Sequence, residues 1–250
     1  MLTQRIVGNV VPVGDVGSAT VDAMHRLFAR HYDCVDALKF QADLHQKSWM
    51  LLLQDSVSQD VIGFSTMVLM EASVAGERFK ALFSGDTVID RTYWGSQELV
   101  RVWCRFVGQL KRRYPERFYW FLISKGYRTY LFLPLYFWNF YPRFDRPTPP
   151  LEQQLLDALA ATRFPHDFNP TTGLIEFKKS HGHLKPELAT IEPHQLRNPH
   201  VKFFLERNPG YVHGHELVCI AELSPENMRR LAGQVLRDAL GLPRSLVMTQ

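Results

Sequence analysis

The spacing of apolar residues predicts an alternation of helices and strands in the first half of the chain. Apolar positions recur at helical spacing in residues 18–33 and again in 35–44, which predicts two helices at the start. Runs of β-forming residues follow at 49–55, 61–70 and 79–89, separated by turns. The first two runs predict an antiparallel pair, and the third continues it.

The apolar period changes after Asp90 and predicts a βαβ unit. Apolar residues recur at helical spacing from about Thr92 to Leu110, and the run Phe118 to Ile123 reads as a buried strand. A strand, a helix and a strand in this order form a right-handed crossover whose two strands run parallel. The first amides of that helix would point out of the carboxyl edge of the sheet, where they favour a phosphate.

The second half of the chain is richer in proline and polar loops. Arg146 to Pro150 is a rigid stretch that marks a boundary. Four elements are predicted after it: a helix, two short strands and a last helix with a serine cap and a proline in the favoured places, at Leu151–Thr162, Gly173–Phe177, Glu216–Ala221 and from Ser224-Pro225 onward. We therefore expect a core unit at 1–145 and a C-terminal part, 146–250, that completes the sheet and adds helices.

The turn after the third strand and the order of the elements resemble the GNAT superfamily, the GCN5-related N-acyltransferases. GNAT proteins carry there a turn of the form Val-Asp-Pro-Glu-Tyr-Arg-Gly-x-Gly-x-Gly or Ala, and Ile89 to Leu99 falls on it. Tyr93 and Gly95 match well, whereas Trp94 replaces the arginine, Gln97 the second glycine and Leu99 the third small residue. The resemblance covers Val21 to Tyr141 and implies an α/β fold, a mixed sheet with splayed central strands and here a C-terminal extension.

The resemblance also implies where an acyl donor would bind. The strand backbone at Val88 and Ile89 would hold the pantetheine arm in the gap between the splayed strands. The residues expected to meet the donor's phosphates are Tyr93, Trp94, Gly95, Ser96 and Gln97 in the turn, and Ser124, Lys125 and Arg128 at the carboxyl end of the second parallel strand, where ligands of open α/β sheets gather. Because the glycines are replaced, the donor could be acyl-CoA or the thioester of an acyl-carrier protein.

Two residues are candidates for the acid–base chemistry of acyl transfer. Asp86 occupies the neighbourhood in which many GNAT proteins place an acidic base; the alternative is a turn or bulge residue after Gly85. Tyr136 occupies the position of the acid that returns a proton to the leaving thiolate, because Leu135-Tyr136 resembles the end of the family's corresponding helix. Its alternative is aromatic packing. The helices at the start would wall the acceptor site, with His31, Tyr32 and Asp33 near it.

The most apolar stretch, Tyr130 to Tyr141, is about half the length that crosses a bilayer and contains Pro134, which argues against a membrane span. We expect a buried or groove-lining helix there. Its rings either form ordinary core, wall a channel for a long acyl chain, or touch a membrane surface. The altered phosphate turn and these rings favour a long acyl chain over acetyl.

Composition narrows the remaining classes. A chain of 250 residues can bury a large core without metal or disulfide help. Cys34, Cys104 and Cys219 form no CxxC pair, so we expect reduced thiols and the cytoplasm. The segment Met1 to Arg5 carries no export signal. Histidines are plentiful, but no carboxylate or cysteine stands beside them at ligand spacing, so we expect no metal site.

The net charge of +4 is mildly basic, and Lys111-Arg112-Arg113 is the densest basic cluster. At the end of a helix this cluster offsets the helix dipole and forms a solvated face; the alternative is that it meets an acidic carrier protein or a nucleotide phosphate. No basic stripe or motif for nucleic acid is present. Two hypotheses result: an N-acyltransferase acting on a primary amine, or a noncatalytic GNAT-like module that binds or senses an acyl ligand.

Overall fold

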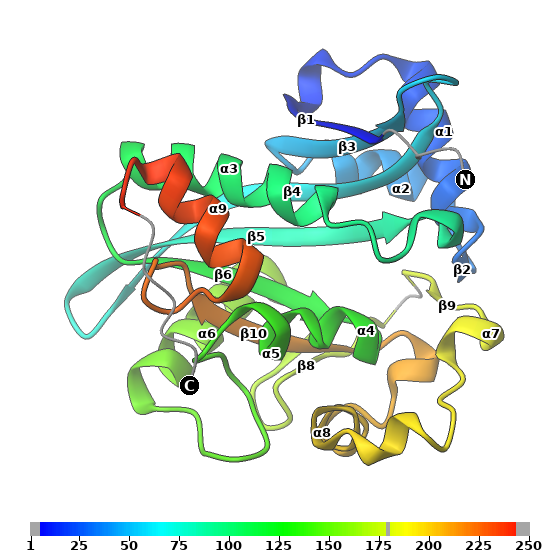
Figure 1. The fold of residues 1–250 in the computed structure, drawn as a ribbon. Helices are drawn as coiled ribbons and strands as arrows, with labels where there is room; N and C mark the ends of the chain where they lie inside the picture. Colours follow the sequence, from blue (N-terminus) through cyan, green and yellow to red (C-terminus); the bar gives the residue numbers. More distant parts are fainter. Residues whose placement is uncertain (1–5, 179–180, 244–250) are drawn as a thin grey trace.

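Within residues 6–178 and 181–243, which the computed structural model describes, an eight-stranded mixed sheet runs through the protein (Figure 1). The strand order is β1-β3-β4-β5-β6-β10-β8-β7. The bounds are β1 Ile6–Pro12, β3 Trp49–Asp55, β4 Val61–Val74, β5 Glu77–Ile89, β6 Phe118–Ser124, β7 Phe168–Asn169, β8 Leu174–Ile175 and β10 Glu216–Glu222, and a separate pair joins β2 Tyr32–Asp33 to β9 His183–Leu184. The predicted fold class, a mixed α/β sheet, is confirmed.

Among the described strands, β5 and β6 are the one parallel pair. They are connected by the helix that the change of apolar period predicts, so the predicted βαβ unit is confirmed. β10 is antiparallel to β6 and lies inside the sheet, between β6 and β8. Segments from both halves of the chain therefore build one sheet.

Helices cover both faces of the sheet. The bounds are α1 Ser18–Ala29, α2 Ala37–Leu44, α3 Glu98–Arg113, α4 Tyr127–Tyr130, α5 Phe132–Tyr136, α6 Pro150–Arg163, α7 Pro186–Ala189, α8 Pro199–Arg207 and α9 Arg230–Leu240. Side chains of α1 and α2 pack on one face of β3 and β4, and α6 packs on the same face further along. On the opposite face α3, α9 and α5 share the largest apolar cluster. Alternate strand residues supply the two cores, as the pleat requires.

α9 packs closely against α3. A Cβ atom added at Gly108 of α3 would come within 2.5 Å of the Ala239 Cβ, so only glycine permits this approach. The Arg112 guanidinium also donates a hydrogen bond to the Ala239 carbonyl. Part of the basic cluster at the end of α3 therefore binds α9. No helix in the described part of the chain is long and apolar enough to cross a membrane.

The predicted helix Tyr130 to Tyr141 is wrong beyond Tyr136. The chain leaves α5 there and runs extended, and its backbone pairs with segments far away in the sequence. The Trp138 amide donates to the Asn227 carbonyl (2.9 Å), and the Tyr141 amide donates to the Ile220 carbonyl (2.8 Å). These long-range bonds satisfy amides that a helix would have satisfied locally. The rings of Tyr130, Phe137 and Phe140 are buried in the core.

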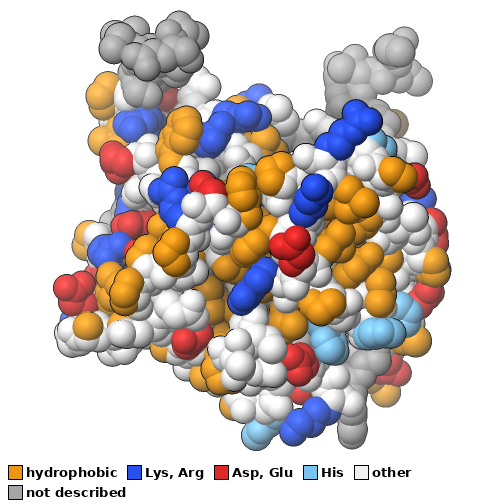
Figure 2. Space-filling view, turned by 90° about the horizontal axis from the view of Figure 1, so that it is seen from below, with side chains coloured by type: hydrophobic (Ala, Val, Ile, Leu, Met, Phe, Trp, Pro, Cys, Tyr) orange, Lys and Arg blue, Asp and Glu red, His pale blue; other side chains and the backbone are white. Residues whose placement is uncertain are grey.

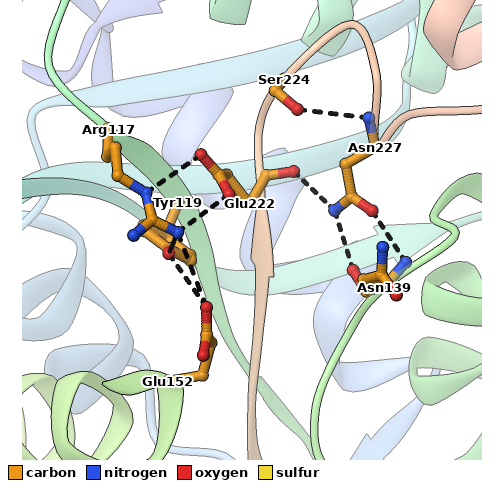
Figure 3. Close-up of polar contacts among 7 residues, drawn as sticks. All are labelled: Arg117, Tyr119, Asn139, Glu152, Glu222, Ser224 and Asn227. Carbon is orange, nitrogen blue, oxygen red and sulfur yellow. Dashed lines mark hydrogen bonds and ion pairs between the residues drawn. The ribbon is translucent and has the colours of Figure 1, made fainter. Parts of the chain in front are cut away.

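Asn227 anchors this extended segment (Figure 3). Its side-chain amide donates to the carbonyls of Asn139 (2.8 Å) and Glu222 (2.9 Å), and its Oδ1 accepts from the Asn139 amide (2.7 Å). Beside it, Arg117 bridges Glu222 (3.1 Å) and Glu152 (3.6 Å). The network closes the end of the sheet opposite the carboxyl end of β6.

Other boundaries differ from the sequence expectation. The last helix begins at Arg230 and not at Ser224, because the Ser224 hydroxyl accepts the Asn227 amide (3.2 Å) in a separate turn. α3 begins at Glu98, after a short 3-10 turn at Arg91–Tyr93. The edge strand β1 is not predicted at all, and the segment 1–5 lies outside the described residues. On the face seen in Figure 2, acidic and basic side chains are interspersed among apolar ones.

Candidate active site

The parallel strands β5 and β6 separate near their carboxyl ends. They are paired from Lys80 opposite Phe118 to Ser84 opposite Leu122. Beyond Ser84, β5 continues to Ile89 with β4 alone beside it. Gly85 stands at the point of separation, where a Cβ would come within 2.8 Å of the Thr66 Oγ1 and 3.1 Å of the Lys47 Cε. The chain is therefore tightly packed on one side of the gap and open on the other.

Three cavities meet at this gap. The α2-side cavity, about 470 Å³, lies among α1, α2, the end of β5 and the start of β10. The α3-end cavity, about 420 Å³, lies among the turn before α3, α4, α5 and α7. The inner pocket, about 50 Å³, lies between the strands and the helices α3, α5 and α9. Thr87 and Thr129 line all three, so the cavities converge at these two residues.

The α2-side cavity contains a carboxyl pair, Asp86 from β5 and Asp43 from α2. Asp43 forms ion pairs with Lys47, whose side chain is only 2 % exposed, and with Arg163 (3.6 Å). Burial alone would raise the pKa of Asp43, but the charge and hydrogen bond of Lys47, aided by Arg163, bring that pKa below its ordinary value. Asp43 is therefore the ionised member of the pair.

Asp86 has the opposite shift. Burial raises its pKa most; Lys47 and Lys125 oppose this, and the charge and hydrogen bond of Asp43 add to it, so that the pKa of Asp86 lies above its ordinary value. A carboxyl group with a raised pKa holds a proton more readily and can act as a base nearer neutral pH. Asp86 is thus a base candidate on chemical as well as positional grounds.

A second buried pair closes the same cavity. Lys125 at the end of β6 lies 3.3 Å from the Glu216 carboxylate at the start of β10, and its ammonium also donates to the His181 carbonyl (3.2 Å). Burial raises the pKa of Glu216, and Lys125 opposes the shift. The Lys125 ammonium stands 5.2 Å from the centre of the Tyr32 ring. Both polar partners of the Lys125 ammonium, Glu216 and His181, thus belong to residues that line the α2-side cavity.

The α3-end cavity opens on the turn that leads into α3. Gly95 there has φ +92, in the left-handed region that favours glycine, and the space beside it is open. The Trp94 indole donates to the Ile89 carbonyl (2.8 Å), and the Arg128 guanidinium lies 5.3 Å from the Trp94 ring. Arg128 also donates to the Leu188 carbonyl (2.8 Å). The Arg128 guanidinium and the positive N-terminal end of the 16-residue helix α3 thus both lie at the opening of the α3-end cavity.

Tyr136 stands where the inner pocket meets the α3-end cavity. Its ring stacks on Phe132, with centroids 6.2 Å apart. None of the described residues forms a hydrogen bond with its hydroxyl group. Burial raises the pKa of Tyr136, so the phenol stays protonated and can donate.

Most of the residues expected from the sequence come together in the α3-end cavity, and four do not. Its walls include Val88, Ile89, Trp94, Gly95, Ser96, Gln97, Arg128 and Tyr136. Tyr93 turns away, because its hydroxyl donates to the Asp55 carboxylate (3.1 Å). Lys125 lines the α2-side cavity, as Asp86 does. Ser124 is fully buried beside the Cys219 thiol.

Several site residues carry no sequence signal. Asp43, Lys47 and Glu216 come from α2, the loop after it and β10, and only the fold brings them to Asp86. The i, i+4 spacing of Asp43 and Lys47 is common on any helix. His31 lines the α3-end cavity; its Nδ1 donates to the Leu27 carbonyl (3.0 Å), and its Nε2 is buried with no partner among the described residues. Of the expected acceptor wall, Tyr32 lines both large cavities, whereas Asp33 binds Lys185 (3.5 Å).

No protein-family model matches this chain, and no curated protein matches it in sequence. Solved structures match parts of it. A conserved protein of Enterococcus faecalis V583, described as a probable N-acyltransferase, has 12% identity over 54% of this chain and 33% of its own, with a TM-score of 0.41. The GNAT family N-acetyltransferase YhbS of Escherichia coli, in complex with CoA, has 14% identity over 49% of this chain and 64% of its own, with a TM-score of 0.37.

An acetyltransferase of Trypanosoma brucei has 14% identity over 58% of this chain and 100% of its own, with a TM-score of 0.38. The match thus spans a third of the first of these proteins and just under two thirds of the second. Parts of this chain are thus similar in structure to a protein described as a probable N-acyltransferase and to a GNAT family N-acetyltransferase.

Proposed function

We propose that the protein is an N-acyltransferase of GNAT type, which transfers an acyl group from a pantetheine thioester to a primary amine. One observation carries the proposal. Two cavities, one with the carboxyl group of Asp86 and the other with the phenol of Tyr136, meet at the gap between β5 and β6. A reaction that joins two substrates and needs a base and an acid suits this arrangement.

The donor occupies the α3-end cavity in this proposal. Its pantetheine arm passes along Val88 and Ile89, where β5 has no neighbour on the side of β6. The phosphates lie at the turn Trp94–Gln97, near the first amides of α3 and the guanidinium of Arg128. These groups favour an anion because amides and a cation both stabilise negative charge.

The amine occupies the α2-side cavity, beside Asp86. An ammonium group bound there gives one proton to the Asp86 carboxylate and becomes a nucleophile. Its nitrogen attacks the thioester carbonyl carbon, a C–N bond forms and the C–S bond breaks, while the nitrogen releases its second proton to water. The departing thiolate takes the phenolic proton of Tyr136, and both side chains then regain their starting states by exchange with water.

A covalent acyl-enzyme route through a cysteine has little support. Cys104 lines the inner pocket, but burial raises its pKa, so the thiol remains protonated. A protonated thiol is a poor nucleophile. Direct transfer between the two substrates therefore fits the site better.

Two sequence features bear on the nature of the donor. The expected preference for a long fatty acyl chain rests on the altered phosphate turn and on a helix from Tyr130 to Tyr141. This helix ends at Tyr136, and the rings of Tyr130, Phe137 and Phe140 belong to the core. An acidic acyl-carrier protein was suggested by Lys111-Arg112-Arg113, but these residues end α3, away from its first turn at the cavity. Acyl-CoA is therefore the donor we propose.

A noncatalytic acyl-binding module is the second candidate. It is favoured by the turn before α3. The Arg128 guanidinium lies 5.3 Å from the Trp94 ring there, and Gln97 and Leu99 stand in place of two small residues of the GNAT turn. Such a module would bind the thioester and would not turn it over.

The test combines binding with turnover. Thermal unfolding is followed with free coenzyme A, pantetheine and acetyl-CoA, because a ligand of the native state raises the melting temperature. A panel of primary amines is then incubated with acetyl-CoA, and free thiol release is measured for the wild type and for Asp86→Asn. Binding together with thiol release lost in the variant supports the enzyme. Binding without release for any amine supports the module, and no binding of either thiol overturns both.

A further inference from the structure

The inner pocket is a blind branch at the place where the two larger cavities meet. It shares Gly85 and Ile123 with the α2-side cavity and Leu99, Val100 and Tyr136 with the α3-end cavity. From there it enters the protein between the strands and the helices α3 and α9. Its deep wall is formed by Trp103, Cys104, Trp120, Phe137, Met228 and Ala232. A thioester carbonyl at the junction would direct its acyl group into this branch.

The wall is fixed by contacts that the proposed function does not use. The Trp120 indole donates to the Ser84 hydroxyl (2.9 Å). Its ring centre lies 5.0 Å from that of Trp103 and 5.6 Å from that of Phe137. Three large rings thus hold one another in place, and a packed interior of this kind resists enlargement. The pocket is a preformed feature with a defined depth.

The volume limits what can enter. About 50 Å³ corresponds to on the order of four water-sized groups. Among the described lining residues none is charged; the Ser84 hydroxyl already accepts the Trp120 indole, and the Ser65 hydroxyl is hydrogen-bonded to that of Thr87 (2.8 Å). A carboxylate there would be buried without a cation to balance its charge, at high energetic cost.

We propose that the inner pocket is the acyl-binding site and that Trp103 and Trp120 set its depth, so that the enzyme uses short, uncharged, aliphatic acyl groups of about two to four carbons. This inference rests on the proposed function, because it places the donor's carbonyl at the cavity junction. It replaces the long-chain preference with a size limit that the walls define.

The experiment measures binding of coenzyme A and of its acetyl, propionyl, butyryl, hexanoyl, palmitoyl and succinyl thioesters by titration calorimetry. Each methylene that enters the pocket tightens binding about fourfold, since its burial contributes about 0.8 kcal/mol. We expect affinity to rise from acetyl to butyryl and to fall at hexanoyl, palmitoyl and succinyl.

Two variants move the limit in opposite directions. Trp103→Leu opens the deep wall and shifts the best chain to about two carbons longer. Ala232→Val adds bulk to the wall and shifts the best chain toward acetyl. The matched control is Trp49→Leu, because Trp49 packs on Phe106 of the same helix face outside the pocket (5.1 Å) and its loss should leave the order of chains unchanged.

The outcomes separate the two claims. Two results would overturn the acyl pocket and leave the proposed function standing, provided that coenzyme A binds. One is an affinity that keeps rising with chain length up to palmitoyl. The other is an unchanged order of chain preference in Trp103→Leu and Ala232→Val. Absence of any binding of coenzyme A would overturn both. If Trp103→Leu does not fold, Ala232→Val alone decides, since it must weaken butyryl relative to acetyl.

Discussion

Asp86 of β5 and Asp43 of α2 line the same α2-side cavity, and their pKa values move in opposite directions. Lys47 and Arg163 hold Asp43 in its ionised form, and this fixed negative charge then disfavours a second one on Asp86. Two carboxyl groups of the same type thus acquire different tasks through their neighbours. In the proposed reaction, Asp43 stays ionised and Asp86 accepts the proton.

The role of Lys47 can be measured in the pH profile of the reaction. Lys47→Met removes a charge that lowers the pKa of Asp86, so the rise of kcat/KM with pH should move to higher pH. The comparison is with Lys202→Met, which removes an exposed lysine of α8 and should leave the midpoint where it is in the wild type. An unchanged midpoint in Lys47→Met would contradict the role of Asp86 as the base.

Stability should depend on pH through Asp86 in a defined sense. Its folded-state pKa lies above the unfolded value of about 4. The resulting stabilisation is complete below that value and is lost as pH rises through the folded pKa. Asparagine cannot ionise, so Asp86→Asn should melt at a higher temperature than the wild type at pH 8 and at nearly the same temperature at pH 4.

Asp55 serves as a control because its carboxyl pKa is shifted in the opposite direction to that of Asp86. The amides of Val57 (2.8 Å) and Ser58 (3.1 Å) donate to its carboxylate and lower its pKa. Its stabilisation is present above the unfolded pKa and is lost as pH falls. Asp55→Asn should therefore melt below the wild type at pH 8, and the two variants should diverge in thermal scans. If both variants shifted the melting temperature in the same direction at pH 8, burial of Asp86 would not be what disfavours its charge.

Tyr136→Phe should lower kcat about a hundredfold and leave KM unchanged, because in the proposed reaction the phenol acts only when the thiolate departs. The raised pKa also predicts that wild-type kcat keeps its value up to about pH 10. Tyr114→Phe, at the end of α3, is the control for loss of one hydroxyl group. A rise in KM at constant kcat would mean that Tyr136 binds the donor and does not protonate it.

Arg128→Gln tests contact with a donor phosphate. Loss of a charged hydrogen bond should weaken coenzyme A ten- to a hundredfold, about 1.5–3 kcal/mol, and should not change the affinity for pantetheine, which lacks the nucleotide. Arg105→Gln removes an exposed arginine from the middle of α3 and should leave both affinities unaltered. Equal weakening of both ligands would place Arg128 in the structure of the cavity and not at the phosphate.

Asn227→Ala tests why the chain leaves the helix at Tyr136. Three hydrogen bonds to Asn139 and Glu222 are lost, at about 1 kcal/mol each, so the free energy of unfolding should fall by roughly 3 kcal/mol in urea titrations. Ser224→Ala, which removes the single bond to the Asn227 amide, should cost about a third as much. A loss below 1 kcal/mol for Asn227→Ala would mean that the extended segment is held by its rings.

The strands at the centre could be predicted because each is a continuous apolar run. The expected strand Phe118 to Ile123 differs from β6 by one residue, and the parallel pairing follows from the crossover rule. The edge strand β1 has half-exposed residues and a glycine, so its pattern is weak. The helix predicted after Tyr136 is wrong because the segment's apolar pattern carries no sign of its hydrogen bonds to Asn227, which lies far away in the sequence.

The sequence predicts only those site residues that fall on a position of the GNAT element order and also have a side chain suited to acyl transfer. Asp86 and Tyr136 were placed by resemblance, and their cavities converge at Thr87 and Thr129. The charged residues that shift the pKa of Asp86, namely Lys47, Asp43 and Lys125, lie in segments far apart in the sequence, and only the tertiary structure brings them together. Lys125 shows the same limit, since its partner Glu216 is not visible from its own segment.

The position of β10 affects the order in which the protein can fold. β10 lies between β6 and β8, although nearly all of the sheet precedes it in the chain. During synthesis, β6 must wait with an unpaired edge until the strand that covers it has left the ribosome. Such late pairing gives a high contact order and slow folding. We expect the growing chain to expose this edge to other strands and to depend on chaperones until β10 arrives.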